Sequence, residues 1–303
     1  MPYKKTYYSN GKLLLTGEYL VLDGALALGL PTRFGQSLEV QSLDTPIIDW
    51  KSLDNKRKVW FETSFQLPRI YSDDSNSTVN TLKKILDEAQ KQHPGFLSGG
   101  KGYRVTTKLD FPTDWGLGTS STLLNNVAQW AGVDAFELLQ KTMGGSGYDI
   151  ACAQNNKPIA YRLENKKPFV QTLDFYPDFA EQLYFVHLNR KQQSAKEIQN
   201  FRNQNKNFNF EIETISELTS LLIKSTALDD FEKIIKEHEL VMQHVLQKEP
   251  VQKSYFKDYF GQIKSLGAWG GDFILATGNT DTPKYFKKKG YNTILLYDEM
   301  ILG

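Results

Sequence analysis

One short segment, PTDWGLGTSS at positions 112–121, constrains the fold of this chain more than any other. It connects a predicted strand at 103–109 to a predicted helix at 119–130, whose apolar residues follow helical spacing. This order of strand, glycine-rich loop and helix predicts a fold that mixes strands and helices. It also places a glycine-rich loop directly before a helix N-terminus.

The residues of this loop have the chemistry of an anion site. Gly116 and Gly118 let backbone amides approach a phosphate, because glycine has no Cβ to interfere. The unpaired N–H groups and the dipole at a helix N-terminus favour an anion. Three hydroxyls gather at that point: Thr119, Ser120 and Ser121. The same residues also suit a glycine-rich turn with a Ser/Thr cap, so the local pattern leaves both interpretations open.

The rest of the chain alternates between strand and helix signals. Short apolar runs separated by tight turns predict β structure at 11–15, 19–22 and 25–28. β-branched and alternating segments predict further strands at 37–42, 59–65, 158–163, 169–173, 183–188, 274–277 and 293–297. Apolar residues at helical spacing predict helices at 77–92, 135–142, 212–223 and 228–246. The Asn-rich stretch 200–209 is predicted to be an exposed loop.

Composition limits the partners of the chain. Lys and Arg number 36 against 35 Asp and Glu, so no net field is available to hold a nucleic acid or an anionic membrane. No apolar run approaches the roughly 20 residues that cross a bilayer, and we expect a soluble protein. The single cysteine, Cys152, excludes an intramolecular disulfide and fits a reducing compartment, so we expect a cytoplasmic protein. The oligomeric state stays open.

The loop PTDWGLGTSS resembles the P-x-x-x-G-L-G-S-S-A loop of the GHMP superfamily, named for galactokinase, homoserine kinase, mevalonate kinase and phosphomevalonate kinase. Thr119 stands where the family has its first serine, and Ser121 stands in place of the usual alanine. The resemblance implies that this loop binds the phosphates of ATP and that the Ser120 hydroxyl reaches Mg²⁺. The implied phosphate-binding residues are Pro112, Gly116, Leu117, Gly118, Thr119, Ser120 and Ser121.

Two further segments resemble motifs of the same family. GKLLLTGEYLVLDGA at 11–25 is similar to the first motif, in its phosphomevalonate kinase form, and implies that Lys12, Glu18 and Tyr19 line the active site. Read alone, this segment is a β-hairpin with a surface lysine. GGSGYDIACA at 144–153 resembles the turn that carries the catalytic aspartate. It implies Asp149 as the base, with Ser146 and Gly147 at the substrate, whereas its simpler reading is an aspartate that caps a short helix.

The last motif lies near the C-terminus, in KSLGAWGGDF. It resembles the family's G-A-G-G-G-D loop, which folds back beside the substrate and the phosphate. Trp269 stands where the family has a glycine, and we expect its indole to narrow the cleft or redirect the loop. The implied substrate-binding residues are Gly267, Ala268, Gly270, Gly271 and Asp272.

Together the four motifs imply an α+β, two-domain GHMP kinase fold. Residues 1–178 are expected to form an ATP-binding, ribosomal protein S5-like α/β domain, and residues 179–303 a ferredoxin-like domain. The implied activity is transfer of the γ-phosphoryl group of ATP, with Mg²⁺, to a hydroxyl or phosphate of a small anionic acceptor such as mevalonate or phosphomevalonate. Lys12 and Asp149 are the implied catalytic residues.

Two alternatives stay open. The first is ATP-dependent decarboxylation of mevalonate diphosphate, although that family's turn resembles G-S-G-S-A and not the G-S-G-Y-D found here. The second is a catalytically weak or inactive binding or regulatory protein, which Trp269 and the short segment before Asp149 motivate. A helix that usually supplies a second acidic Mg²⁺ ligand has no clear counterpart in that segment, where Glu137 is the nearby candidate.

Overall fold

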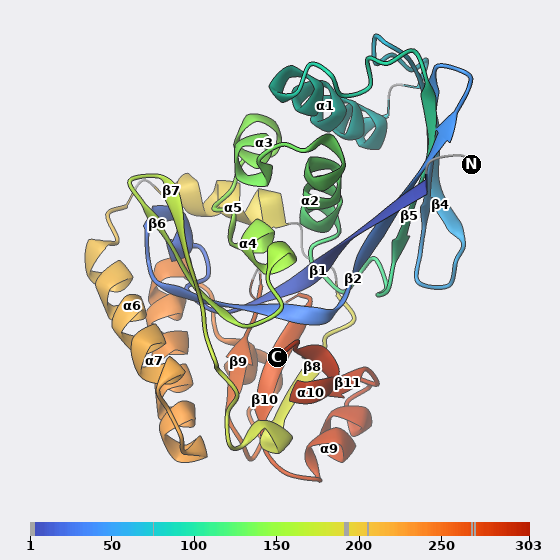
Figure 1. Cartoon of the computed structure of the whole chain (residues 1–303). Coiled ribbons are helices and arrows are strands. Elements are labelled where there is room, and N and C mark those ends of the chain that lie inside the picture. The colour runs from blue at the N-terminus through green and yellow to red at the C-terminus, as the bar shows by residue number, and fades with distance from the viewer. Residues whose placement is uncertain (1–3, 75, 191–193, 205, 268, 270) are drawn as a thin grey trace. The chain divides into compact units, whose positions relative to one another are not determined.

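The computed structural model describes residues 4–74, 76–190, 194–204, 206–267, 269 and 271–303 (Figure 1). The chain forms two compact units, and each is built from separate stretches of sequence. The first unit contains residues up to 11, 34–113 and 117–154, and the second contains 12–33, 114–116 and 155–303. Strands β1 (Lys4–Thr16) and β2 (Ala27–Leu43) each contribute to both units. The predicted boundary between residues 178 and 179 stays a prediction.

The first unit contains one end of a large mixed sheet. Strand β2 pairs antiparallel with β5 (Gly102–Leu109), and β5 pairs parallel with β3 (Ile47–Leu53). Strand β4 (Val59–Gln66) pairs antiparallel with β3 at the edge. The predicted strands at 37–42, 59–65 and 103–109 are confirmed, whereas β3 was not predicted.

Four helices pack in the first unit: α1 (Ser77–Gln92), α2 (Thr119–Ala131), α3 (Ala135–Thr142) and α4 (Tyr148–Gln154). The predicted helices at 77–92, 119–130 and 135–142 are confirmed. The Asn76 side chain caps α1 by accepting hydrogen bonds from the amides of Thr78 and Val79. Leu86 and Leu124 from these helices share one hydrophobic core with Trp50 of the sheet.

The second unit contains a four-stranded antiparallel sheet of order β11-β8-β10-β9. Its strands are β8 (Leu183–His187), β9 (Ile263–Ser265), β10 (Phe273–Thr277) and β11 (Ile294–Leu296). Every residue of β8, β9 and β10 is buried. In the same unit, β6 (Ile159–Glu164) pairs with the start of β2 and with β7 (Lys167–Thr172). The order of the large sheet is thus β4-β3-β5-β2-β6-β7, with β1 beside β2.

The remaining helices belong to the second unit. They are η1 (Leu20–Asp23), η2 (Ala180–Gln182), α5 (Ser194–Arg202), α6 (Asn209–Ile223), α7 (Leu228–Leu246), α8 (Val251–Tyr255), α9 (Thr282–Lys288) and α10 (Tyr297–Met300). The predicted helices at 212–223 and 228–246 are confirmed by α6 and α7. None of the helices in the described residues is both long enough and apolar enough to cross a membrane.

Two local predictions were wrong. Residues 19–22 do not form a strand, because Tyr19 adopts a positive φ of 61° and starts the 3-10 turn η1. Composition cannot separate a strand from a helical turn in so short an apolar run. The stretch 200–209 is not a continuous exposed loop, since α5 extends into it and the rings of Phe201 and Phe208 are buried and stacked at 5.5 Å.

Candidate active site

Residues 114–116 of the glycine-rich loop are held in the second unit by side chains from three other parts of the chain. The His187 Nε2 atom lies 3.2 Å from the Asp114 carbonyl oxygen. The Trp115 ring meets the Phe273 ring edge-on, with 5.4 Å between centroids. Lys12 on β1 donates a hydrogen bond of 2.9 Å from Nζ to the carbonyl oxygen of Gly116. The lysine of the first motif therefore contacts the glycine-rich loop directly.

Any residue other than glycine at position 116 would force the neighbouring side chain or the loop to shift. Its φ is 66°, and a Cβ at this position would lie 2.2 Å from Oδ2 of Asp272. Asp272 is buried and immediately precedes β10, while Gly267 has a φ of 60° and also faces the Asp272 carboxylate. The structure therefore brings together Lys12, Gly116, Gly267 and Asp272, which come from three motifs that are distant in the sequence.

The second half of the loop starts helix α2 in the first unit. Gly118 occupies the N-cap position in the left-handed conformation, with φ 93° and ψ 42°, and no side chain caps the helix. Amides at an uncapped helix N-terminus can bind an anion. Leu117 is fully buried and fixes the loop, Pro112 and Thr119 are half-buried, and Ser120 is exposed.

The side-chain hydroxyl groups in the first turn of α2 differ in their hydrogen-bond partners. Ser121 is buried and donates to the Gly118 carbonyl oxygen at 2.9 Å. Thr122 Oγ1 lies 2.8 Å from Oε1 of Gln36 on β2. Ser121 therefore stabilises the loop itself, whereas Ser120 presents its side chain to solvent at the same turn.

The third motif forms the start of helix α4 in the first unit. Ser146 and Gly147 are buried, and Gly147 has a φ of 89°. Asp149 is half-buried and lies inside the first turn of α4, where a carboxylate interacts favourably with the helix dipole. Its Oδ1 atom accepts a 3.1 Å contact from the amide of Ile150. Lys12 belongs to the second unit and Asp149 to the first, and their joint catalytic role stays a prediction.

Glu18 and Tyr19, also predicted to line the site, are buried in the second unit. Glu18 forms an ion pair with Lys264, and its side chain is 1% exposed. Tyr19 packs against Phe201 with 5.5 Å between ring centroids. Prediction from sequence missed three residues around Glu18: Lys264, His238 and Glu239.

Trp269 stands at the position where the resembling family motif has a glycine. Its φ is 56°, which is strained for a bulky side chain, and its ring is 4% exposed. The ring belongs to a hydrophobic cluster that includes Tyr19 and Phe201, and its Nε1 atom has no hydrogen-bond partner among the described residues. The indole thus fills a core. Gly271 is buried, whereas the predicted residues Ala268 and Gly270 lie outside the described residues.

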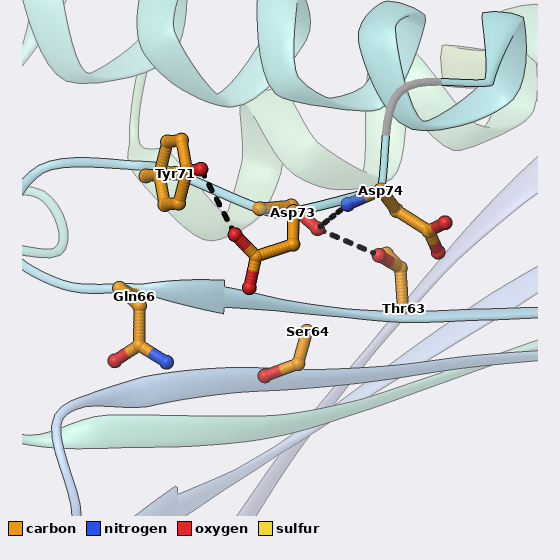
Figure 2. A pocket seen from close by; sticks show the side chains of 7 residues that line it. Thr63, Ser64, Gln66, Tyr71, Asp73 and Asp74 are labelled. Carbon is orange, nitrogen blue, oxygen red and sulfur yellow. Dashed lines mark hydrogen bonds between the residues drawn. The ribbon is translucent and has the colours of Figure 1, made fainter.

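The remaining candidates in the described part of the chain are Glu137 and a pocket. Glu137 is half-exposed on α3 and pairs with Lys141 at 2.6 Å, as a solvated helix face does. Within the described part of the chain, no group of three or more His, Cys, Asp or Glu side chains could hold a metal ion. Figure 2 shows a pocket in the first unit whose lining includes none of the motif residues. It is lined by Thr63, Ser64, Gln66, Tyr71, Ser72, Asp73 and Asp74.

Comparison with known proteins identifies the fold of this chain through solved structures. No protein-family model matches the sequence, and no curated protein sequence matches it. Among solved structures, the mevalonate kinase of Methanococcus jannaschii is similar over 99% of both chains, with a TM-score of 0.73 and 15% identity. The phosphomevalonate kinase of Streptococcus pneumoniae, solved with phosphomevalonate and AMPPNP, has a TM-score of 0.69 and 16% identity over 94% of this chain and 95% of its own.

A third match is the galactokinase of Lactococcus lactis, solved with galactose, with a TM-score of 0.70 and 14% identity over 99% of this chain and 94% of its own. The chain therefore has the two-domain α+β fold of the GHMP kinases, and the resemblance that the four motifs predicted is confirmed. At identities this low the similarity establishes the fold. The activity and the substrate are separate questions, because one fold carries many functions.

Proposed function

We propose that the protein is an ATP- and Mg²⁺-dependent kinase that transfers the γ-phosphoryl group to a hydroxyl or phosphate of a small anionic acceptor such as mevalonate or phosphomevalonate. One observation carries the proposal. Lys12 donates to Gly116 of the glycine-rich loop, and the space beside Gly116 is filled by Asp272 of the last motif. Three motifs with the family's phosphate-site chemistry thus converge on one backbone position. The single free cysteine, Cys152, fits the cytoplasmic location that we propose with this activity.

The residues fit a nucleotide triphosphate. Helix α2 has no side-chain cap, and Gly116 and Gly118 both adopt positive φ angles that turn the backbone of the loop. We assign the phosphates to this loop and to the first-turn amides of α2, with Thr119 beside them. The exposed Ser120 hydroxyl would hold Mg²⁺. Magnesium, when bound, neutralises charge on the β- and γ-phosphates.

Phosphoryl transfer requires mainly positioning and charge neutralisation, and the proposed residues divide these tasks. Asp149 accepts the proton of the acceptor hydroxyl while the acceptor oxygen forms its bond to phosphorus and the bond to ADP breaks. Lys12 stabilises negative charge on the transferring group. Gly267, Gly271 and Asp272 support the acceptor side, together with Ser146 and Gly147. Glu18 and Tyr19 act through the packing of the second unit, because both are buried.

The two alternatives predict different products. A decarboxylase would release CO₂, but the turn Ser146 to Asp149 retains an aspartate in the first turn of α4. A binding or regulatory protein is favoured by the solvated position of Glu137, which leaves the proposed Mg²⁺ site with one identified side chain. It predicts nucleotide binding without turnover.

A screen of Mg-ATP turnover tests the proposal. The purified protein is incubated with mevalonate, phosphomevalonate, mevalonate diphosphate or galactose, and release of ADP and CO₂ is measured. ADP without CO₂ with one acceptor supports the kinase, and CO₂ identifies the decarboxylase. ATP binding without ADP release for any compound contradicts the kinase and favours the binding protein.

The loop is tested by replacing Gly118 with Val. A branched side chain at φ 93° is strained and stands where we place the triphosphate, so nucleotide affinity should fall by about 100-fold or more. Gly290→Val is the matched control, since Gly290 also has a φ of 90° but follows α9, away from every motif. Calorimetry with AMPPNP measures both. Unchanged affinity in a folded Gly118→Val protein removes the loop from the proposed site.

A further inference from the structure

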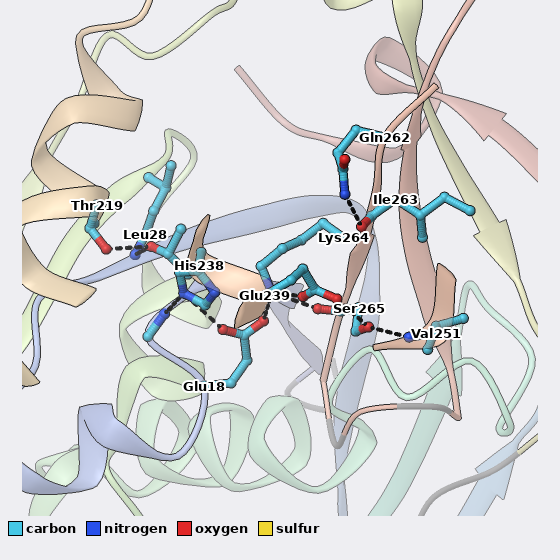
Figure 3. Close-up of polar contacts among 12 residues, drawn as sticks. Glu18, Leu28, Thr219, His238, Glu239, Val251, Gln262, Ile263, Lys264 and Ser265 are labelled. Carbon is cyan, nitrogen blue, oxygen red and sulfur yellow. Dashed lines mark hydrogen bonds and ion pairs between the residues drawn. The ribbon is translucent and has the colours of Figure 1, made fainter. Parts of the chain in front are cut away.

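A fully buried cluster of charged groups in the second unit has no role in the proposed phosphoryl transfer (Figure 3). Lys264 on β9 forms ion pairs with Glu18, which follows β1, and with Glu239 on α7, the latter at 3.1 Å. The lysine also donates to the Ser265 carbonyl oxygen at 2.7 Å, and Ser265 Oγ donates to Glu239 at 2.7 Å. The side chains of Lys264, Glu18 and Glu239 are 0%, 1% and 3% exposed. We name these residues, with His238, the Lys264 cluster.

The Lys264 cluster joins the two arms of the proposed active site. The first arm runs from Lys12 to Glu18, and the second runs from Lys264 to Asp272. At one end, Gly116 lies between Lys12, which donates to its carbonyl, and Asp272, which fills the space beside its Cα. At the other end, Lys264 binds Glu18 directly. The two arms are therefore connected at both ends within one compact unit.

The charges of the cluster do not balance. Two carboxylates face one lysine, so the formal charge is −1 when His238 is neutral. A net buried charge without water costs several kcal/mol, and a bound proton removes it. Burial raises the pKa of Glu18 to about 7 although Lys264 opposes this, and burial also raises the pKa of Glu239. Burial would lower the pKa of Lys264, but Glu18 and Glu239 outweigh it, so the lysine stays charged.

The contacts of His238 show where the additional proton fits. Its Nε2 atom accepts the amide hydrogen of Gly17 at 3.2 Å, and burial lowers its pKa well below the usual range. Glu18 Oε2 lies 3.4 Å from the same nitrogen and has no hydrogen-bond partner among the described residues. Two acceptor atoms at this separation repel each other unless one carries a proton. Protonation of Glu18 on Oε2 removes that repulsion.

We infer that Lys264 is a positioning residue for the phosphate loop, and that the Lys264 cluster holds one additional proton, carried by Glu18 on Oε2, that keeps the two arms together. The inference rests on the proposed function for its catalytic meaning, and on the buried geometry for the proton. Loss of the proton leaves two unbalanced carboxylates beside one lysine. The turn after β1 then loosens, and with it the hold of Lys12 on Gly116.

The proton is tested without any activity. In protein labelled with ¹³C at the glutamate side chains, the Glu18 carboxyl resonance, assigned from Glu18→Gln, is followed from pH 4 to 9. We expect Glu18 to titrate near pH 7, about two units or more above the ordinary glutamate value. A Glu18 midpoint near the ordinary value of 4.5 overturns the inference, whether or not the protein is a kinase.

The positioning role is tested with a charge-matched pair of substitutions. Lys264→Met with Glu239→Gln keeps the formal charge of the cluster at −1 and removes the connection to Glu18. We expect amide hydrogen exchange to become about 10-fold faster in peptides covering 12–18 and 271–277, and Mg-AMPPNP affinity to fall about 10- to 100-fold. Lys233→Met with Asp230→Asn, an exposed pair on α7, is the control and should change neither quantity.

Glu18→Gln covers the case in which the paired variant does not fold, because it keeps Lys264 bound to Glu239. The ratio of the wild-type Mg-AMPPNP affinity to that of the control variant Glu237→Gln should not change with pH. The ratio of the wild-type Mg-AMPPNP affinity to that of Glu18→Gln should fall about 10-fold between pH 6 and 8.5. Wild type loses the additional proton from Glu18 over this range, whereas the variant has no such proton to lose. Identical pH profiles of wild type and Glu18→Gln, or unchanged exchange in both arms of the folded paired variant, overturn the positioning role. Wild-type protein that binds no Mg-AMPPNP contradicts the proposed function, and the exchange experiment still decides about Lys264.

Discussion

At the scale of single residues, the motifs identify some residues of the candidate site and miss others that the structure places in the buried charge cluster. Lys12 and Asp272, from two of the motifs, both lie against Gly116 of a third. Lys264 was missed because a lysine between Ile263 and Ser265 has the pattern of an exposed strand position, whereas its partner Glu18 lies 246 positions away. Burial of a charge depends on such distant partners, and local sequence carries no sign of it.

Asp149→Asn keeps the shape of the side chain but removes the proton acceptor. If Asp149 is the base, kcat should fall by roughly 10² to 10⁴ with little change in ATP affinity. Lys12→Met should lose charge stabilisation as well, and the double variant should cost less than the sum because both residues serve one step. Turnover with the acceptor found in the screen gives kcat, and calorimetry gives affinity.

A stability measurement on the same Asp149→Asn sample separates catalysis from helix stabilisation. A role limited to the first turn of α4 costs about 1 kcal/mol of unfolding free energy and leaves kcat near normal. Near-normal kcat in the folded variant would rule out the catalytic role. A large loss of kcat at unchanged melting temperature supports it.

Trp269→Gly should destabilise the protein even though it restores the residue type of the family motif. Removal of a buried indole costs about 3 to 5 kcal/mol, and relief of the positive φ of 56° returns about 1 kcal/mol. We therefore expect a net loss of about 2 to 4 kcal/mol in the unfolding free energy measured with urea. Trp60→Gly, at an exposed position on β4, is the control for loss of a tryptophan.

The activity of Trp269→Gly addresses specificity separately. If the indole limits the acceptor, the folded fraction of Trp269→Gly should phosphorylate mevalonate or phosphomevalonate when wild type does not. Turnover of either compound by wild type excludes that role for Trp269.

At the scale of helices and strands, periodicity predicted long elements well and short ones poorly. Helices α1, α6 and α7 follow their apolar spacing, and the predicted bounds lie within a few residues. Strand β3 was missed because its sequence IIDWKSL alternates only weakly, although Trp50 within it is fully buried. The turn η1 was mistaken for a strand because its direction is fixed by Tyr19 and Gly24, both at positive φ.

The connection among β1, α7 and β9 predicts a pH dependence of stability. The folded protein keeps the Glu18 proton up to about pH 7, whereas the unfolded chain releases it near the ordinary value of 4.5. Between these values the folded state binds more protons, so this contribution to stability is full at low pH and is lost as pH rises. The slope reaches about 1.4 kcal/mol per pH unit.

Glu18→Gln lacks this titration. From pH 5 to 7.5 its unfolding free energy should therefore rise relative to wild type by roughly 2 to 3 kcal/mol. His238 acts in the opposite direction, because its lowered pKa costs stability as pH falls below its usual range, but both proteins contain it. Urea unfolding at the two pH values gives the difference, and Glu237→Gln should run parallel to wild type. Parallel curves for Glu18→Gln would show that Glu18 titrates normally.

At the scale of the whole molecule, the order of four motifs predicted the fold class, and the solved structures confirm it. What the sequence could not give is the composition of the compact units. Residues 12–33 pack with the C-terminal half of the chain, and residues 117–154 pack with the N-terminal strands. Each unit combines separate stretches of sequence because β1 and β2 are long enough to contribute to both units. The alternation of apolar and polar residues alone does not predict the length of a strand well.

The long strands β1 and β2 also set the order in which the protein can mature on the ribosome. The first unit uses residues up to 154, so all of its strands and helices have been synthesised when half of the chain is complete. The second unit begins with residues 12–33 but closes its small sheet with β11 at Ile294–Leu296. Lys12 and Glu18 must therefore wait for their partners until Lys264 and Asp272 have been synthesised. During that interval the glutamate that is buried in the folded protein is an ordinary, solvated acid.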